Sequence, residues 1–237
     1  MPEPHLTIIM PVYNERSTVL EILRRVRELP IDKEIIIVDN CSTDGTRELI
    51  KNISHSDVRI ILQQRNMMKG NSVKRGIAQA RGKCVVVQDG DLEYYPRDLL
   101  TLLEVMQQDD VVATFGSRIL GARVNNRPLP RSVHRIGAGV INRFFHLLYQ
   151  SSLSDIASCY KMAGRETLQN MHLRCDGFDL DYEIAAKLQL LARKQGKRIV
   201  ELPISYAPRT VAEGKKINWR DGLHALATLC RCRWSAM

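Results

Sequence analysis

Short, continuous runs of apolar residues alternate with helix-like stretches along the first half of the chain. The runs lack the polar residue at every second position that marks a strand with one solvated face, so we expect helices to cover both faces of each strand. Such an alternation predicts βαβ units and a parallel sheet. The expected strands are Leu6–Val12, Glu34–Val38, Val58–Leu62, Cys84–Gln88 and Val111–Phe115, and the expected helices cover about 17–29, 43–53, 70–81 and 97–108.

The second half of the chain has a less regular pattern. A basic loop that contains two prolines covers 121–132, and loops of this length often carry function. Because no internal repeat, low-complexity tract or linker separates the halves, we expect a single domain over 1–237. The elements expected after the loop are helices over 133–149, near 179–195 and over 217–234, a strand over Arg198–Pro203, and a further segment over Asp155–Met162.

Polar residues gather directly after several of the predicted strands. The stretch VVVQDGDLEYYP (85–96) leaves a valine-rich strand and at once presents Asp89, Asp91 and Glu93. Ligands of parallel sheets bind beyond the carboxyl ends of the strands, and Mg²⁺ or Mn²⁺ is typically held by one or two carboxylates together with substrate phosphates. On their own, acidic residues at such a position are more often turn and helix-entry residues. Neither GxGxxG nor GxxxxGK[ST] occurs, so neither a dinucleotide fold nor a P-loop is indicated.

The composition is that of an ordinary soluble protein, with 44% hydrophobic and 26% charged residues. No apolar run approaches the ~18 residues that a membrane span needs, and the N-terminus lacks the basic flank of a secretory signal. The six cysteines form no CxxC pair and the histidine spacing suggests no zinc site, which favours reduced thiols in a cytoplasmic protein.

The net charge of +9 is distributed unevenly along the chain. Residues 1–114 contain 15 Lys and Arg against 17 Asp and Glu, whereas residues 115–237 contain 20 against 9. A strongly basic second half indicates an anionic partner for that half. Nucleic acid, a phosphorylated substrate and an anionic membrane all remain open on this evidence.

Five motifs occur in a fixed order along the chain: MPVYNERSTVLEIL, EIIIVDNCSTDGT, MKGNSVKRGIAQARGK, VVVQDGDLEYYPRDL and GSRILGAR. Together they resemble the motifs of the family 2 glycosyltransferases with the GT-A fold. Three downstream pieces are similar to the dolichol-phosphate mannosyltransferase branch, which loads a sugar onto a polyprenyl phosphate: SDIASCYKM, GFDLDYEIAAKL and ELPISYAPRTVAEGKKINWRDGLHAL. The resemblance covers nearly the whole chain. It implies an α/β, GT-A type nucleotide-sugar-binding domain with a mostly parallel central sheet flanked by helices, followed by C-terminal amphipathic helices.

By this resemblance, residues 1–115 would form a nucleotide-binding half and residues 116–237 an acceptor-binding half. The residues of PVYNE would line the nucleobase and ribose pocket, with Asp39 below the base. Asn40 and Met68 stand where the family usually has an acidic residue and a glycine, so the nucleobase remains open. The residues expected to bind the donor are Pro11, Tyr13, Glu15, Asp39, Lys69, Gly70, Asp89 and Lys215.

The resemblance also implies a metal-dependent transfer that inverts the anomeric centre. Asp89 and Asp91 match the DxD motif that binds Mg²⁺ or Mn²⁺, and Glu93 stands where the family often has a third polar residue beside the metal. The metal would neutralise the leaving diphosphate, and a dianionic lipid phosphate can attack the anomeric carbon without a general base. A single displacement then gives a β-linked product from an α-linked donor. The residues expected to be catalytic are Asp91, Arg118 and Arg209.

The acceptor phosphate is expected to meet arginines of the second half, because a guanidinium fork suits phosphate oxygens. An isolated arginine is more often a solvated surface charge, and only the position within the motifs favours these residues. Arg209 and Lys215 would meet the donor diphosphate. Asp155, residues 159–161 and Glu183 are assigned to the sugar site or its architecture, although FDLDYE is equally explained as an acidic helix entry. The candidates for the acceptor phosphate are Arg118, Arg131 and Arg135.

The predicted helices 133–149 and 217–234 are candidates for contact with a membrane surface. Both are basic and amphipathic, and Trp219 and Trp234 belong to the second of them; helices of this kind lie in the plane of anionic membranes. From the pattern alone, packing on the sheet is the simpler interpretation, and a polyprenyl acceptor is what favours the membrane. We expect a peripheral protein at the cytoplasmic face of a membrane, docked by its own helices or by a membrane-anchoring partner subunit.

Three rival hypotheses compete with a GDP-mannose-dependent transferase. A family 2 enzyme that uses UDP-glucose or another UDP-sugar, or a non-lipid acceptor, would share the same motifs. A nucleic-acid-binding protein would explain the basic half, but its arginines alternate with apolar helix positions and no such binding motif occurs. A catalytically inactive regulator is disfavoured because Asp89, Asp91 and Arg118 are all present.

Overall fold

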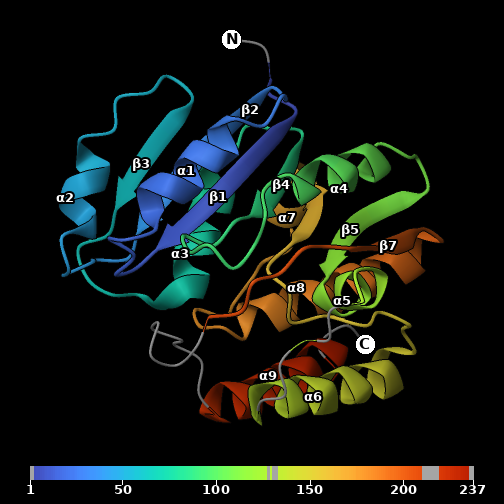
Figure 1. Ribbon diagram of the computed structural model, residues 1–237. Helices are drawn as coiled ribbons and strands as arrows, with labels where there is room; N and C mark the ends of the chain where they lie inside the picture. Colours follow the sequence, from blue (N-terminus) through green and yellow to red (C-terminus); the bar gives the residue numbers. More distant parts are fainter. Residues whose placement is uncertain (1–2, 127–128, 130–132, 210–218, 235–237) are drawn as a thin grey trace.

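The strands form one seven-stranded sheet with the order β3-β2-β1-β4-β6-β5-β7 (Figure 1). The computed structural model describes residues 3–126, 129, 133–209 and 219–234. Neighbouring strands are parallel except β6, which runs antiparallel to both β4 and β5. The mostly parallel sheet that the sequence predicts is therefore confirmed. The strands are β1 (Leu6–Val12), β2 (Lys33–Asp39), β3 (Val58–Leu62), β4 (Cys84–Val87), β5 (Val111–Ser117), β6 (Lys161–Gly164) and β7 (Arg198–Pro203).

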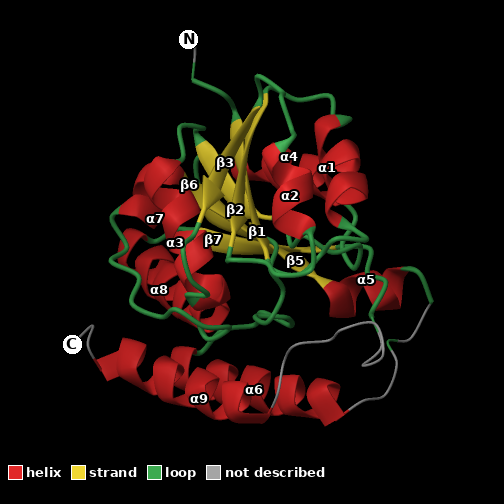
Figure 2. Ribbon diagram, turned by 90° about the vertical axis from the view of Figure 1, so that its left-hand side faces the viewer, coloured by secondary structure: helices red, strands yellow, loops and turns green. Residues whose placement is uncertain are grey.

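Helices cover both faces of this sheet, and a further pair of helices lies beneath it. Figure 2 shows α1, α2 and α4 on one face and α3, α7 and α8 on the other. Helices α6 and α9 pack against each other, and both contact α8. The helices are α1 (Val19–Arg27), α2 (Thr46–Lys51), α3 (Met68–Gln79), α4 (Asp98–Met106), α5 (Arg118–Val124), α6 (Val133–Tyr149), α7 (Arg165–Gln169), α8 (Leu180–Gln195) and α9 (Trp219–Trp234).

Strands β1 and β2 are almost entirely buried in the hydrophobic core. Ile8, Ile9 and the three isoleucines at 35–37 have no exposed surface, and burial of each such side chain stabilises the fold by about 1.5–3 kcal/mol. Strand β3 differs, because all five of its residues are only partly buried. It lies at the edge of the sheet with a single neighbouring strand, which explains why its residues are less buried than those of β1 and β2.

Three elements of the structure are absent from the sequence-based prediction. Strand β6 begins with Lys161 and ends with Gly164, so it shows no apolar run, yet it lies between β4 and β5. The short helices α5 and α7, of seven and five residues, are below the length at which periodicity is informative. The helices expected over 17–29, 43–53 and 97–108 are shorter at both ends in the structure.

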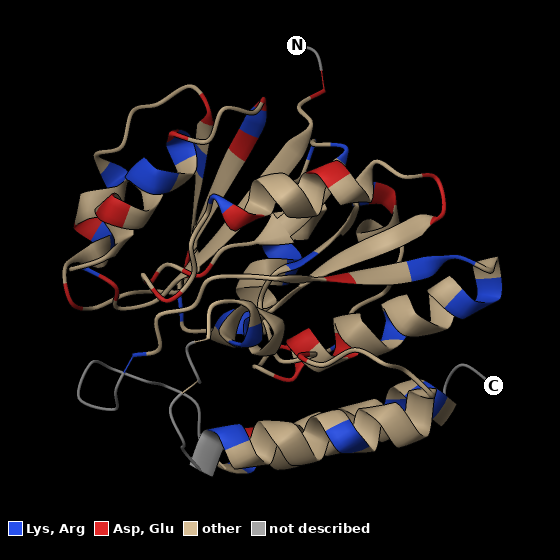
Figure 3. Cartoon of the chain, turned by 45° about the vertical axis from the view of Figure 1, so that its right-hand side comes forward, with Lys and Arg blue, Asp and Glu red and all other residues tan. Residues whose placement is uncertain are grey.

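The two helices beneath the sheet expose apolar side chains on their outer side. On α6 the exposed residues include Ile136, Val140 and Leu147, and on α9 they include Leu223 and Trp234. Arginines occur on the same helices (Figure 3). Among the residues that the structure describes, no helix is long and apolar enough to cross a membrane.

Candidate active site

A cavity of about 960 Å³ opens at the carboxyl end of the parallel strands. Residues that follow β1, β2 and β4 form one wall, and the first turns of α3, α5 and α8 form another. Residues of α6 and α9 close the side opposite the sheet. The predicted site residues that line the cavity are Pro11, Tyr13, Glu15, Lys69, Asp89, Asp91, Glu93, Arg118, Arg135 and Arg209.

Two predicted residues, Arg131 and Lys215, lie outside the described residues. Two described ones, Asp39 and Gly70, are not among the residues that line the cavity. Asp39 is fully buried, accepts the N–H of Ser42 (3.2 Å) and pairs with Arg47 (3.5 Å). Asp39 therefore holds the turn after β2, whereas Gly70 is a packing residue.

Gly70 lies where α3 meets the segment that leads into α8. A Cβ atom at this position would lie 2.7 Å from the backbone carbon of Asp176 and from the carbonyl oxygen of Gly177. Only a glycine allows this close approach without a shift of the backbone. Gly70 therefore has a structural role, which keeps α3 and its Lys69 close to α8, and its expected contact with the donor stays a prediction.

Asn40 takes the place in the cavity wall that was expected for Asp39. Its side-chain oxygen accepts the backbone N–H of Met67 (2.8 Å), and its Nδ2 donates to Asn66 Oδ1 (2.9 Å). Asn66 Oδ1 also accepts the N–H of Met68 (3.0 Å). These bonds fix the loop that enters α3, so Asn40 shapes the pocket at the end of β2.

Asp89 is paired with a lysine from the first turn of α3. Lys69 Nζ lies 2.7 Å from Asp89 Oδ1 and 3.7 Å from Asp181 Oδ2. Burial acts to lower the pKa of Lys69, but the negative charges of Asp89 and Asp181 outweigh it and raise the pKa above its usual value. Lys69 is therefore a fixed cation next to the first acidic residue of the DxD motif.

Asp91 is paired with an arginine from the far end of the chain. Arg209 Nη2 lies 2.6 Å from Asp91 Oδ2, while Arg209 also donates to both carboxylate oxygens of Glu15 (2.9 and 3.1 Å). Burial, followed by the charge of Asp89, raises the pKa of Asp91 to about 6, although Arg209 opposes this rise. The ionised form of Asp91 is thus poorly stabilised, and a further cation at this point would stabilise it.

Glu93 contacts the segment that carries Arg209. Its carboxylate accepts the hydroxyl of Tyr206 (2.9 Å) and the backbone N–H of Arg209 (2.6 Å), and its carbonyl accepts the N–H of Ala207 (2.8 Å). Over the described parts of the chain, no cluster of three or more His, Cys, Asp or Glu side chains is arranged to hold a metal. Glu93 therefore anchors residues 206–209, and its expected place beside a metal stays a prediction.

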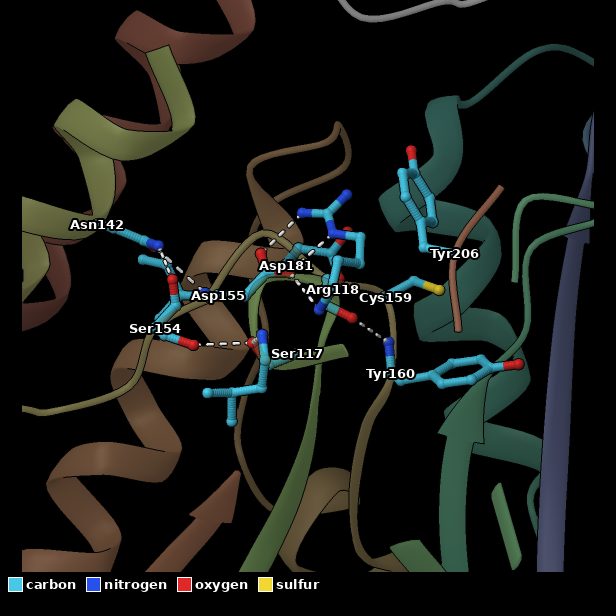
Figure 4. Close-up of polar contacts among 12 residues, drawn as sticks. Ser117, Arg118, Asn142, Ser154, Asp155, Cys159, Tyr160, Asp181 and Tyr206 are labelled. Atoms are coloured by element: carbon cyan, nitrogen blue, oxygen red, sulfur yellow. Dashed lines mark hydrogen bonds and ion pairs between the residues drawn. The ribbon is translucent and has the colours of Figure 1, made fainter. Parts of the chain in front are cut away.

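Arg118, the first residue of α5, is held by Asp155. Its Nε and Nη2 each donate to Asp155 at 2.8 Å, and its backbone N–H donates to the same carboxylate at 3.0 Å (Figure 4). Burial acts to raise the pKa of Asp155, but Arg118 outweighs it and the pKa is lowered. The guanidinium carbon also lies 5.2 Å from the ring centroid of Tyr206. The fork is thus fixed in orientation at the cavity wall.

Arg135 lies near the beginning of α6 and is exposed at the cavity wall. It donates a hydrogen bond to the carbonyl of Leu129. The structure therefore brings Arg118 and Arg135 to the same cavity as the acidic pair, as a site for two anionic groups requires. Arginines from the second half of the chain and carboxylates from the first half therefore line the same cavity.

Comparison with known proteins identifies the family. A model of glycosyl transferase family 2 matches residues 7–170. The chain belongs to glycosyl transferase family 2. The glycosyltransferase AglJ of Haloferax volcanii is 28% identical over 213 residues, which cover 88% of this chain and 65% of that protein. The dolichol-phosphate mannosyltransferase of Pyrococcus furiosus is 27% identical over 213 residues, covering 89% of this chain and 58% of that protein.

These relatives confirm the resemblance that the motifs indicate, and the chain spans less than two thirds of the length of both. Solved structures with the same fold include glucosyl-3-phosphoglycerate synthase from Mycobacterium tuberculosis. Its complex with Mn²⁺, UDP-glucose and phosphoglyceric acid gives a TM-score of 0.70 at 16% identity, covering 98% of this chain and 80% of that one. The expected GT-A type fold of this family 2 glycosyltransferase is confirmed.

Two residues that line the cavity, Asp181 and Tyr206, escape prediction from the sequence. Asp181, in the first turn of α8, pairs with Lys161 (3.2 Å) and faces Lys69 within the cavity wall. Its position in GFDLDYE is equally typical of a helix entry, so the motif alone does not distinguish the two roles. Tyr206 follows β7, and its partner Glu93 lies 113 residues away, which no local pattern signals.

Glu183 has a structural role in this family 2 glycosyltransferase. The buried carboxylate accepts the N–H groups of Arg174 (2.9 Å) and Cys175 (2.8 Å) and pairs with Lys187 (2.8 Å). Burial acts to raise the pKa of Glu183, but the bonds from Lys187 and the two backbone N–H groups outweigh it, so the pKa is lowered. Glu183 therefore fixes the segment before α8.

Replacing Glu183 with glutamine should lower the free energy of unfolding by about 1–3 kcal/mol at neutral pH, because buried charge-assisted bonds are lost. Since the folded-state pKa lies below the ordinary 4.5, the charge stabilises the fold fully above that value and progressively less as the pH falls through the folded-state pKa. The melting temperatures of wild type and Glu183→Gln should therefore converge as the pH falls below 4.5 and through the folded-state pKa of Glu183. The exposed Glu104→Gln is the matched control, and a difference that grows in acid would contradict this assignment.

Proposed function

We propose that this chain transfers a hexose from a nucleotide sugar to a polyprenyl phosphate, with inversion at the anomeric carbon. GDP-mannose is the favoured donor. The observation that carries the proposal is the charge arrangement of the cavity, where Asp89 and Asp91 lie beside two cations, Lys69 and Arg209, and Arg118 lies fixed at the same wall. Residues 1–115 would bind the donor and residues 116–237 the acceptor.

The donor end of the cavity is suited to a nucleoside diphosphate and a divalent cation. Asp89 and Asp91 are two carboxylates at the exit of one strand, and the raised pKa of Asp91 supports a cation there. Two carboxylates with substrate phosphates are a usual ligand set for Mg²⁺, and Mn²⁺ is also bound by carboxylates. When bound, the cation supplies a Lewis acid for the leaving diphosphate. Lys69 and Arg209 are placed to meet the diphosphate oxygens.

The acceptor end of the cavity is suited to a phosphate monoester. Asp155 takes two of the five N–H groups of Arg118, and the guanidinium remains part of the cavity wall. A lipid phosphate is mostly dianionic at neutral pH, so it needs cations and no general base. Burial acts to raise the pKa of Asp181, but Lys161 and Lys69 outweigh it and lower the pKa. Asp181 is therefore committed to ion pairs, and a direct displacement by the phosphate fits the site.

The lipid would reach this cavity from the side of α6 and α9. Both helices contribute residues to the cavity wall, among them Asn142 and Trp219, and the outer side of the same helices is apolar with arginines. An amphipathic basic surface of this kind docks on anionic membranes. We therefore place the protein at the cytoplasmic face of a membrane, docked by this surface or by a partner subunit that covers it.

Replacing Leu147, whose exposed fraction is 77%, with aspartate should weaken binding to anionic vesicles about tenfold, because one buried leucine contributes about 1.5–3 kcal/mol. Co-sedimentation with phosphatidylglycerol vesicles measures this. Leu20→Asp is the matched control, since Leu20 is also exposed but lies on α1, far from α6 and α9 (Figure 1). An equal loss in both variants would contradict docking through α6, and no binding by wild type would favour a partner subunit.

The test of the proposed function is transfer of label into a lipid. Purified protein is incubated with short polyprenyl phosphate, Mn²⁺ or Mg²⁺ and, in turn, labelled GDP-mannose, UDP-glucose and other UDP-sugars. Label from GDP-mannose in the organic phase, abolished by EDTA, is the expected result. Label from a UDP-sugar would retain the reaction and change the donor, whereas donor binding with no labelled lipid from any donor would contradict a polyprenyl acceptor.

A further inference from the structure

The loop that precedes β6 is held from three separate elements. Glu201 on β7 accepts the backbone N–H of Ser154 (2.8 Å) and of Asp155 (2.8 Å). At the end of β5, the hydroxyl of Ser117 lies 2.8 Å from that of Ser154. The third support comes from α6, through Asn142 (Figure 4). The backbone on both sides of Asp155 is thus fixed in position.

Asn142 contacts the loop on either side of Asp155. Its Nδ2 donates to the carbonyl of Ser154, and its Oδ1 accepts the N–H of Ile156 (3.2 Å). The side chain is buried, with 7% of its surface exposed. Because one end of the amide donates and the other accepts, a residue of similar size without both groups cannot replace it.

Asp155 in turn holds Arg118 through both side-chain nitrogens and the backbone N–H. The positions of Asn142, Asp155 and Arg118 therefore depend on one another. We propose that Asn142 is a positioning residue for the acceptor phosphate, which sets the orientation of Arg118 through Asp155 and so links α6 to the acceptor site. This inference rests on the proposed function, because it assigns Arg118 to the acceptor.

The contact between Asn142 and the loop of Asp155 connects the exposed surface of α6 to the cavity. Ile136, Val140 and Leu147 are exposed on its outer side, whereas Asn142 is buried on the side that faces the loop. At 100° per residue, Asn142 is about 200° from Val140 and about 140° from Leu147 around the helix axis. A displacement of α6 at the surface therefore reaches the loop of Asp155. The orientation of Arg118 therefore depends on the position of α6 relative to this loop.

The test compares Asn142→Ala with a matched control on the same helix. Phe145→Leu alters a buried residue three positions away, on the side of α6 that packs inward, without touching the loop contacts. Asn142→Ala removes both loop bonds, so it should raise KM for the polyprenyl phosphate at least about tenfold, with KM for the nucleotide sugar unchanged. Phe145→Leu should lower the melting temperature and leave both KM values near wild type.

A second variant and a second measurement keep the inference testable if Asn142→Ala does not fold. Asn142→Asp keeps the shape and the acceptor for Ile156 but loses the donor to Ser154. In ¹⁵N-labelled protein, the side-chain Nε–Hε signal of Arg118, assigned with Arg118→Lys, should shift in both Asn142 variants and remain in place in Phe145→Leu.

An unchanged Arg118 signal in the Asn142 variants would overturn the inference, as would an equal rise of acceptor KM in Phe145→Leu. The proposed function and the positioning role of Asn142 can each be contradicted without the other. If wild type labels no polyprenyl phosphate, the proposed function fails, and the Arg118 signal still decides whether Asn142 positions this arginine.

Discussion

Replacing Asp91 with asparagine should lower hexose transfer by roughly 10²–10³-fold, the loss typical when charge stabilisation of a transition state is removed. Burial and the charge of Asp89 raise the pKa of Asp91 to about 6 although Arg209 opposes this rise, so a metal cation bound beside Asp91 would stabilise its charge. Asparagine keeps the shape of the side chain and removes its charge. The measurement is the initial rate of transfer at saturating donor, with Mn²⁺ present.

The same substitution should leave the melting temperature unchanged or slightly raised. A buried carboxylate whose pKa is raised is less stable in the fold than in water, so its neutral replacement costs little, and Arg209 keeps its two bonds to Glu15. Asp109→Asn, at an exposed position, is the control and should retain full activity. Retention of more than about a tenth of the activity by Asp91→Asn, well outside the expected range, would contradict the assigned role of Asp91.

Replacing Asp155 with alanine should destabilise the protein by about 3–5 kcal/mol, because the buried charge of Arg118 then has no carboxylate partner. Both side chains of this pair are largely buried, at 4% exposure for Asp155 and 19% for Arg118. For a chain of this size the melting temperature should fall by about 10 °C. Differential scanning calorimetry at pH 7 measures this fall.

Two comparisons separate the cost of an unpaired charge from a general loss of packing. Asp110→Ala removes an exposed partner of Arg198, and a surface pair of this kind contributes less than about 1 kcal/mol. The double variant Arg118→Leu/Asp155→Ala should recover part of the lost stability. It should not recover binding of the acceptor. If Asp155→Ala proves no more harmful than Asp110→Ala, the proposed anchoring of Arg118 is wrong.

Much of the sheet was predictable from apolar runs, because the residues within each of these elements are enough to determine it. Strands β1, β3 and β7 and helix α6 begin and end where the pattern predicts, because each is long enough for its own residues to determine it. Strand β6 is different, since its place between β4 and β5 depends on pairing with residues about 50–80 positions away. A four-residue strand that starts with a lysine has no local signature.

The site shows the same division between local and distant information. The gathering of Asp89, Asp91 and Asn40 at one edge follows from the shared direction of parallel strands. The pairing of Arg209 with Glu15 joins residues 194 positions apart, which spacing cannot reveal. Whether Asp39 or Asn40 reaches the cavity is likewise set by the turn after β2, where the two neighbouring residues point in different directions.

The measurement that tests the central claim most directly gives the protein two acceptors at once. Polyprenyl phosphate and phosphoglyceric acid are offered together with Mn²⁺ and the labelled nucleotide sugar that serves as donor, and the label is then partitioned between organic and aqueous phases. The account predicts label in the organic phase as a β-linked lipid phosphate sugar, with none in wild type treated with EDTA. Label confined to an aqueous phosphoglycerate product would contradict it and assign the cavity to a soluble acceptor.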